Sequence, residues 1–226
     1  MKQYILFDLD GTLTDAGPGI TNSVAYALAQ FGISEPDRRK LNPFVGPPLK
    51  DSFARYYHFS PEEVSRAIDH YRVYFEEKGI FENALYDGIV PLLAACKEAG
   101  KTLVLATSKP RVFAERILTH FQIASFFDFV AGSELDEKTR VNKEEVIEYA
   151  LESMKIPPSE AVMIGDTKFD ILGGKRFSLL TVGVLYGYGS AEELSEAGAD
   201  HVVGTVEELQ ELLFDLLGND PRRNKR

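Results

Sequence analysis

The sequence has little of what marks several large classes of protein. Its 226 residues include one cysteine, Cys96, which excludes an intramolecular disulfide framework and a zinc site built from several cysteines. No apolar stretch approaches the roughly 20 residues of a membrane span, and residues 1–7 are too short for a signal peptide. The formal charge of −10 argues against a nucleic-acid-binding surface. We therefore expect a cytoplasmic protein, a monomer or homodimer, that binds neither nucleic acid nor membrane. The basic tail, residues 221–226, is expected to be disordered.

Short apolar runs alternate with helical patterns along most of the chain. The runs are residues 4–8, 102–107, 126–131, 161–165, 179–185 and 201–203. Amphipathic segments lie between them, and pairs such as Asn142 with Glu145 fit the capping boxes that start helices. Alternating strands and helices, with continuous apolar strands, are typical of a parallel sheet covered on both faces. We therefore predict an α/β fold with a Rossmann-like, three-layer parallel sheet core.

One stretch, residues 16–86, interrupts this alternation and shows only helical patterns. Pro18 suits a first helical turn, and the apolar stripe that follows ends at Gly32. A second helix opens at Ser60, where Glu63 completes a capping box. An insertion of about 70 helical residues after the first strand is large enough for a small domain. We therefore predict an α/β core of residues 1–15 and 87–226, and a helical cap of residues 16–86 that hangs over the first strand's end.

Polar residues lie at the ends of several apolar runs, or at the start of a helix that leads into one. The first run ends in Asp8 and Asp10, followed by a glycine and Thr12. Aspartate is depleted within strands, and carboxylates crowded at a dry edge are unfavourable unless a cation or proton compensates them. Later polar groups in similar places are Thr107, Ser108, Lys143, Asp166 and Asp170. Because parallel connections bring strand ends to one sheet edge, where ligand crevices usually form, we expect these groups to converge.

This set of groups suits phosphoryl transfer. Carboxylate and carbonyl oxygens suit Mg²⁺, and a carboxylate can act as a nucleophile that forms an aspartyl phosphate. A hydroxyl and a lysine can hold the phosphoryl oxygens while charge redistributes. We therefore predict Mg²⁺ as the cofactor and a small phosphorylated metabolite as the substrate.

Structural roles remain open for several of these residues. Thr107 and Ser108 could simply cap a helix that opens near Pro110. Asp166 could be a turn residue, and Asp170 could serve in a capping box opened by the preceding threonine.

Lys143 could be a surface lysine. However, a cation just after the expected cap Asn142 faces the positive end of the helix dipole, which is mildly unfavourable. That placement favours a functional role.

Four motifs, in order along the chain, resemble those of the haloacid dehalogenase-like superfamily. They are Asp8-Leu9-Asp10-Gly11-Thr12, Thr107-Ser108-Lys109, Lys143 and Gly165-Asp166-Thr167-Lys168-Phe169-Asp170. The helical insert resembles the cap of the phosphoglycolate phosphatase-like branch, and the resemblance runs from residue 4 to about residue 216. Dehalogenases of this superfamily lack an acid matching Asp10, so the resemblance implies hydrolysis of a phosphate ester.

The resemblance also implies roles for the acids. Asp8 would attack phosphorus and become phosphorylated. Asp10 would protonate the leaving oxygen and then activate water, while its backbone carbonyl binds Mg²⁺. Asp166 would supply another metal carboxylate beside Asp8.

The remaining motif residues would hold the phosphate or support its ligands. Thr107 and Lys143 would grip the phosphate, helped by backbone N–H groups of Leu9, Asp10 and Ser108. Asp170 would lie behind these groups, joined through water to the metal or paired with Lys143. Thr12 is expected in a similar supporting position.

Substrate choice is expected to lie in the cap. Residues 44–50 resemble the specificity loop of capped relatives, with Gly46 and Lys50 as candidate substrate contacts; packing of this loop on the cap core is the alternative. The sequence does not choose among phosphoglycolate-like, nucleoside monophosphate, pyrophosphate and sugar phosphate substrates. A phosphomutase of the β-phosphoglucomutase type and a non-catalytic module that binds phosphorylated ligands are the alternative functions.

Two positions depart from the family's commonest pattern. Ala16 stands where a serine often follows Asp15, so one hydrogen bond at the cap hinge is expected to be absent. Glu144 follows Lys143 where proline is frequent, which leaves open whether the helix starts at this lysine.

Overall fold

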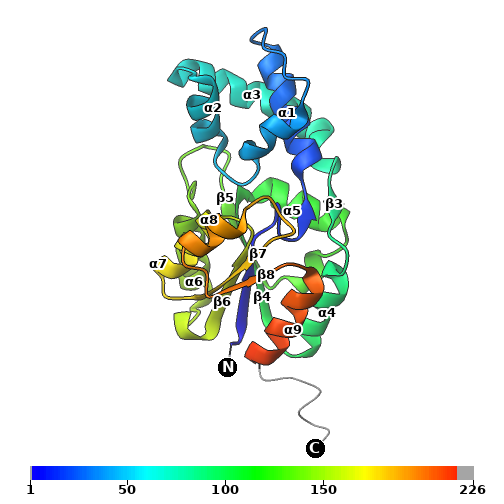
Figure 1. The fold of residues 1–226 in the computed structure, drawn as a ribbon, viewed down its shortest axis with the longest axis vertical. Helices are drawn as coiled ribbons and strands as arrows, with labels where there is room; N and C mark the ends of the chain where they lie inside the picture. Colours follow the sequence, from blue (N-terminus) through cyan, green and yellow to red (C-terminus); the bar gives the residue numbers. More distant parts are fainter. Residues whose placement is uncertain (1, 218–226) are drawn as a thin grey trace, which may run out of the picture.

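A computed structural model describes residues 2–217 and contains a six-stranded sheet with helices on both faces (Figure 1). The strands pair in the order β5-β4-β1-β6-β7-β8, and each neighbouring pair is parallel. Their bounds are β1 (Tyr4–Phe7), β4 (Thr102–Pro110), β5 (Phe129–Ser133), β6 (Ala161–Gly165), β7 (Leu180–Val184) and β8 (His201–Val203). The predicted α/β class and parallel sheet are confirmed; the predicted disordered tail lies outside the described residues.

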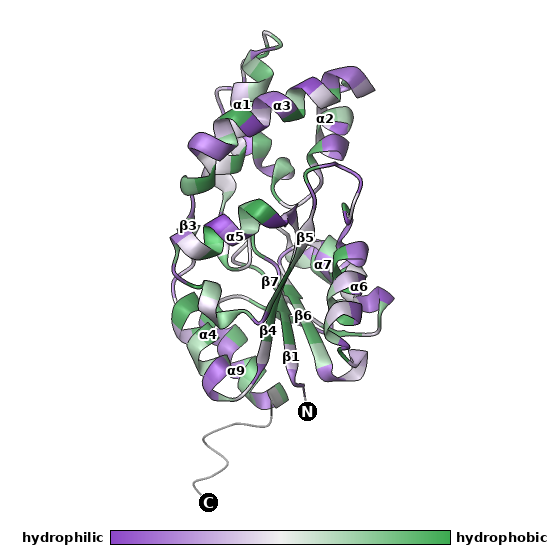
Figure 2. Cartoon of the chain, turned by 180° about the vertical axis from the view of Figure 1, so that it is seen from behind, coloured by the Kyte–Doolittle hydropathy of each residue, from purple (hydrophilic) through white to green (hydrophobic). Residues whose placement is uncertain are grey.

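Two hydrophobic layers follow from the alternation of side chains along the strands. Ile5 and Phe7 of β1 pack in one cluster with the helices on their face, while Leu6 joins a second cluster on the other face. The first face carries α4 (Ile89–Glu98), α5 (Arg111–His120) and α9 (Val206–Leu217), and the second carries α6 (Lys143–Met154) and α7 (Lys168–Arg176) (Figure 2). The short α8 (Ala191–Glu196) lies between β7 and β8 in the chain.

Two predicted strand bounds were wrong by three residues, and the other bounds agree within two. β4 continues to Pro110, three residues beyond the predicted end, and β5 starts at Phe129, where residue 126 was expected. The reason lies in the pairing: Pro110 is opposite Ser133 after a shift of register, and the 3-10 turn Ala124–Phe126 occupies the start of the predicted run. Apolar patterns do not report such pairing, because it depends on the neighbouring strand.

All the regular elements between β2 (Thr14–Asp15) and β3 (Ala84–Leu85) are helical. They are α1 (Gly17–Ala29), the 3-10 helix η1 (Arg38–Phe44), α2 (Leu49–Tyr57), α3 (Pro61–Glu77) and the 3-10 helix η2 (Gly79–Phe81). The predicted absence of a strand from residues 16–86 was wrong, because β3 pairs antiparallel with β2 where the chain leaves and re-enters the core.

Helices α1, α2 and α3 lie beyond one end of the sheet (Figure 1). They contact the core through pairs such as Phe75 of α3 and Phe113 of α5, whose ring centroids are 5.4 Å apart. The predicted capping box at Ser60 is present, and Gly32 with φ +73° follows α1. The division into a core and a cap domain stays a prediction. Within residues 2–217, none of the helices combines the length and apolar character that a membrane crossing requires.

Candidate active site

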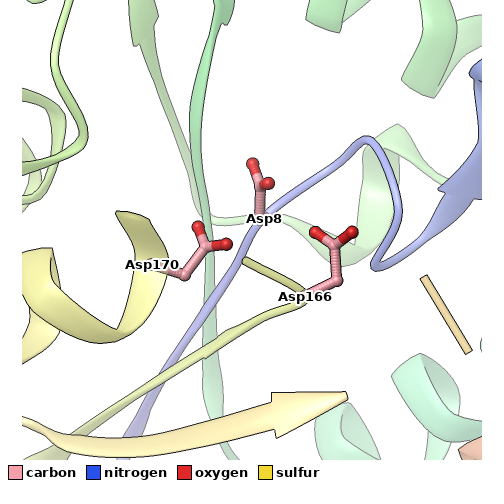
Figure 3. A group of neighbouring side chains, drawn as sticks. All are labelled: Asp8, Asp166 and Asp170. Atoms are coloured by element: carbon pink, nitrogen blue, oxygen red, sulfur yellow. The ribbon is translucent and has the colours of Figure 1, made fainter. Parts of the chain in front are cut away.

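Three aspartates meet at the C-terminal edge of the sheet (Figure 3). Asp8 follows β1, Asp166 follows β6, and Asp170 lies in the first turn of α7. All three are buried, and one carboxylate oxygen of each lies within 4.8 Å of the others. The predicted convergence of strand ends from distant parts of the chain therefore holds for these residues.

Lys143 places an ammonium group among these carboxylates. Its Nζ lies 2.7 Å from Asp8 Oδ1 and 2.8 Å from Asp170 Oδ1, and it donates to the Ala106 carbonyl at 3.0 Å. Burial lowers the pKa of Lys143, but the charges of Asp170 and Asp8 outweigh it, so the net pKa lies above its usual value. Lys143 is also the first residue of α6, so the Glu144 departure leaves the helix start in place. The surface-lysine alternative was wrong, because Lys143 is 5% exposed.

Asp170 performs both of the tasks considered for it. Its Oδ2 accepts hydrogen bonds from the Thr167 backbone N–H at 3.1 Å and hydroxyl at 2.9 Å, which caps α7. Its Oδ1 faces Lys143. Burial raises the pKa of Asp170, while the charge of Lys143 opposes this shift. Because both oxygens already have close polar neighbours, Asp170 is better placed to hold Lys143 than to bind a metal directly.

A second ion pair joins Asp10 to Lys109, a contact that the sequence analysis missed. Lys109 Nζ lies 2.7 Å from Asp10 Oδ2, and the two side chains are only 7% and 10% exposed. The same ammonium group lies 4.7 Å from the ring centroid of Phe75 in α3. Burial raises the pKa of Asp10, and Lys109 opposes this effect. Lys109 belongs to the predicted Thr107-Ser108-Lys109 motif, but it lies in the part of β4 where the register shifts, so strand periodicity gave no signal for its contact with Asp10.

The residues present fit a magnesium ion. Asp10 Oδ1 and Asp166 Oδ1 are buried and have no hydrogen-bond partner among residues 2–217. Burial raises the pKa of Asp166 well above its usual value, and the charges of Asp170 and Asp8 add to this effect. Unpaired carboxylate oxygens in a buried cluster are the ligands that hard divalent cations prefer. A cation bound by Asp8 and Asp166 would offset this crowding.

Backbone geometry around Asp166 leaves room only for hydrogen at Gly11. Gly11 has φ +85°, and a Cβ there would lie 2.0 Å from Asp166 Oδ2. That oxygen accepts a hydrogen bond from the Tyr188 N–H at 2.8 Å. The Tyr188 hydroxyl donates to Asp15 Oδ1, which also accepts from the Gly17 N–H at 3.3 Å. Asp15 therefore accepts hydrogen bonds at the hinge, where Ala16 has no side chain that could form one. No sequence pattern had indicated a role for Tyr188.

The other predicted phosphate ligands lie around the same edge. Thr107 is buried, and its Oγ1 accepts a hydrogen bond from the Lys109 backbone N–H at 3.2 Å. Helix α5 starts only at Arg111, and no side chain caps it. The alternative that Thr107 and Ser108 merely cap this helix was therefore wrong. The Ser108 carbonyl accepts from Ser133 at 2.8 Å. Leu9 and Thr12 are buried in the turn after β1, and Thr12 Oγ1 has no partner among the described residues.

A cavity of about 90 Å³ lies beside Asp10. Asp10, Ser108 and Lys109 line it on the side of the sheet. Gly46, with φ +99°, lines it from the helical insertion, together with the aromatic rings of Phe44, Tyr71 and Phe75. Lys50 lines a separate, neighbouring cavity. The structure thus brings Gly46 to the site but places Lys50 beyond it.

Comparison with known proteins identifies the family. The model of the haloacid dehalogenase-like hydrolases matches residues 5–184. A 5'-nucleotidase of Pseudomonas aeruginosa is 45% identical over 92% of this chain and 94% of its own. The tyrosine-protein kinase PtkA of Mycobacterium tuberculosis is 37% identical over 93% of this chain and 72% of its own. A crystal structure of a predicted phosphatase from Clostridium acetobutylicum is 51% identical, with a TM-score of 0.93 over 95% of this chain and 99% of its own.

The chain therefore belongs to the haloacid dehalogenase-like hydrolases, and the predicted resemblance to their phosphoglycolate phosphatase-like branch is confirmed. The match to this family and to relatives named as phosphatases shows that the chain is a phosphoric monoester hydrolase that acts on small phosphorylated substrates. A binding module without catalysis, the alternative of another class, is thereby set aside.

Proposed function

We propose that this protein is a Mg²⁺-dependent phosphatase that hydrolyses nucleoside monophosphates through an aspartyl phosphate on Asp8. The observation that carries the proposal is the single buried cluster in which Lys143 lies 2.7 Å from Asp8, with Asp166 and Asp170 beside it. A nucleophile, an ammonium group and candidate metal ligands within one buried cluster suit phosphoryl transfer.

The chain's own residues supply both halves of the reaction. In the first, an Asp8 oxygen bonds to phosphorus while the ester P–O bond breaks, and Asp10 gives its proton to the leaving oxygen. In the second, Asp10 takes a proton from water as the water oxygen bonds to phosphorus, and the bond to Asp8 breaks. The raised pKa of Asp10 suits a group that must hold and release a proton. Lys143 and Thr107 would hold the phosphoryl oxygens throughout.

The carboxylates of Asp8 and Asp166 and the backbone carbonyl of Asp10 would hold Mg²⁺. When bound, the ion would offset the negative charge shared by phosphate and carboxylates, which otherwise opposes attack by Asp8. Thr12 and Asp170 would keep these groups in place, with Asp170 acting through Lys143.

Nucleoside monophosphates are proposed among the predicted substrate classes because the nucleotidase relative is 45% identical over nearly the whole chain. The cytoplasmic location, the two-domain division and the oligomeric state stay predictions.

Phosphate release from p-nitrophenyl phosphate and from a panel of nucleoside 5'-monophosphates, with and without Mg²⁺, tests the proposal. Asp8→Asn is expected to lower kcat by a factor on the order of 10³ or more, because the nucleophile is lost. Asp87→Asn, at an exposed aspartate, serves as the matched control and should keep wild-type rates. Substantial turnover by Asp8→Asn would refute Asp8 as the nucleophile. Equal rates of phosphate release with and without Mg²⁺ would refute Mg²⁺ as the cofactor.

Transfer to an acceptor other than water is the second candidate. A relative named as a tyrosine-protein kinase is 37% identical over 93% of this chain, and the predicted phosphomutase alternative is also a transfer reaction. Incubation with labelled ATP and a tyrosine-containing peptide, and separately with a sugar phosphate, distinguishes these cases. Labelled peptide or isomerised sugar phosphate in excess of free phosphate would favour transfer.

A further inference from the structure

A second cavity adjoins the catalytic one and is much larger. Its volume is about 380 Å³, against about 90 Å³ for the catalytic cavity. It lies between helices α2 and α3 and the loop that follows β5, with Lys50, Ala54, Ile68 and Asp136 among its lining residues. We name it the outer cavity.

The catalytic cavity alone is too small for a nucleoside. Its volume of about 90 Å³ is below the roughly 300 Å³ at which pockets for small-molecule ligands typically begin. Pockets for ligands of the size of a nucleoside typically measure about 300–1,000 Å³, a range that includes the outer cavity. A nucleotide bound through its phosphate at Asp8 therefore needs further space for its base.

One ion pair forms the shared wall of the two cavities. Arg72 of α3 and Glu137 of the loop after β5 line both cavities and pair with each other. Arg72 also donates to the Leu135 carbonyl at 3.0 Å. Both side chains are partly exposed, and such ion pairs contribute little to stability, so they can separate at low cost.

The chemistry of the outer cavity suits a flat heterocycle. Its apolar side includes Phe59, Val64 and Ile68, the last two buried. Donors and acceptors lie among its other lining residues, including Lys50 and Asp69. An apolar surface edged by polar groups matches a ring with apolar faces and N–H and C=O groups on its edge.

We propose that the outer cavity binds the base of the nucleoside monophosphate, and that Arg72 and Glu137 separate to join it to the catalytic cavity. This inference rests on the proposed function, because the phosphate must be held at Asp8. It also gives Lys50, a candidate substrate contact predicted from the sequence, a place in substrate choice beside the base.

The first test fills the outer cavity without altering the catalytic residues. Ala54→Trp places a large ring in it from an exposed position on α2. Val73→Trp is the matched control, because Val73 is 53% exposed on α3 and lines neither cavity. Each variant is assayed with p-nitrophenyl phosphate and with AMP, GMP, CMP and UMP, and binding of the four free nucleosides is measured by calorimetry.

For Ala54→Trp, we expect the ratio of kcat/KM for the best nucleotide to that for p-nitrophenyl phosphate to fall at least tenfold. Nucleoside binding should weaken by a similar factor, while Val73→Trp keeps wild-type values in both assays. An unchanged ratio together with unchanged nucleoside binding would overturn the outer cavity as the base site. If wild-type protein releases phosphate from none of these esters, the proposed function fails instead, so the two failures are distinguishable.

The second test addresses the wall between the cavities. Glu137→Gln removes the carboxylate charge but keeps the side-chain size, which should make separation from Arg72 easier. We expect the nucleotide to p-nitrophenyl phosphate ratio to rise at least threefold. A ratio that stays the same or falls would overturn the role of this pair as a barrier.

Discussion

Replacing Lys143 by methionine tests the electrostatic design of the site most directly. Methionine keeps much of the length and the apolar stem of lysine but removes the ammonium group. In the folded protein that group lies 2.7 Å from Asp8 and 2.8 Å from Asp170, and all three side chains are almost fully buried. The variant would therefore leave two carboxylates without their cation, next to a third at Asp166.

The expected loss is large compared with the stability of a typical domain. Removing one partner of a buried ion pair costs roughly 3–5 kcal/mol, because the remaining charge stays buried and unpaired. Typical free energies of unfolding are about 5–15 kcal/mol. With a urea m-value of roughly 2–3 kcal/mol/M, Lys143→Met should lower the unfolding midpoint by more than about 1 M at neutral pH.

Urea unfolding followed by circular dichroism measures this effect, and Lys101→Met provides the control. Lys101 is also 5% exposed, but its Nζ contacts only the Gln3 amide oxygen, at 3.4 Å, among the polar contacts of residues 2–217. Its replacement should cost only about 1 kcal/mol. Equal losses in the two variants, or a Lys143→Met midpoint within about 0.3 M of wild type, would refute the reasoning.

Three further predictions concern the glycine turn, the metal and the lone thiol. Gly11→Ala should lower both activity and melting temperature, because the added Cβ would lie 2.0 Å from Asp166 Oδ2. Gly32→Ala is the control: Gly32 has φ +73°, no atom lies within 4 Å of a Cβ added there, and the change should lower the free energy of unfolding by only about 1 kcal/mol. Mg²⁺ at about 100 times its Kd should stabilise the wild type by about 2.7 kcal/mol in calorimetry, and Asp166→Asn should lose most of this shift. Burial raises the pKa of Cys96 from 9.0 to about 12, so the folded thiol keeps a proton that the unfolded chain releases. Stability should therefore fall as pH rises from about 9 towards 12 in urea titrations, and Cys96→Ala should reduce that fall; a pH-independent midpoint would contradict it.

Features that depend on order along the chain could be predicted from the sequence. The run of residues 161–165 became β6 with the predicted bounds, because a fully buried strand is apolar throughout and ends where polar groups begin. Asp8 and Asp166 followed from the same reasoning, since both stand directly after such runs. Parallel pairing of β1 with β6 then brought them together.

Features that depend on contacts across the fold could not be predicted in this way. The pairing of Lys109 with Asp10 requires β4 to continue past Thr107, and that extension is set by pairing with β5. The hydrogen bonds of Tyr188 join a loop after β7 to the hinge before α1, and no periodic pattern marks them. Lys50 lies on the expected loop and helix start, yet it faces the outer cavity, because helix orientation decides which cavity a side chain reaches.

The position of Lys143 shows how a local cost can identify a functional residue. A lysine at the first position of α6 faces the positive end of the helix dipole, which typically costs about 0.3–1 kcal/mol. Without the ammonium group, its two buried carboxylate partners would stay uncompensated, which costs roughly 3–5 kcal/mol. Removing the lysine would therefore cost several times more than its unfavourable place in the helix. Because the partners lie on elements remote in sequence, a residue that looks misplaced within its own helix indicates where the fold concentrates opposite charge.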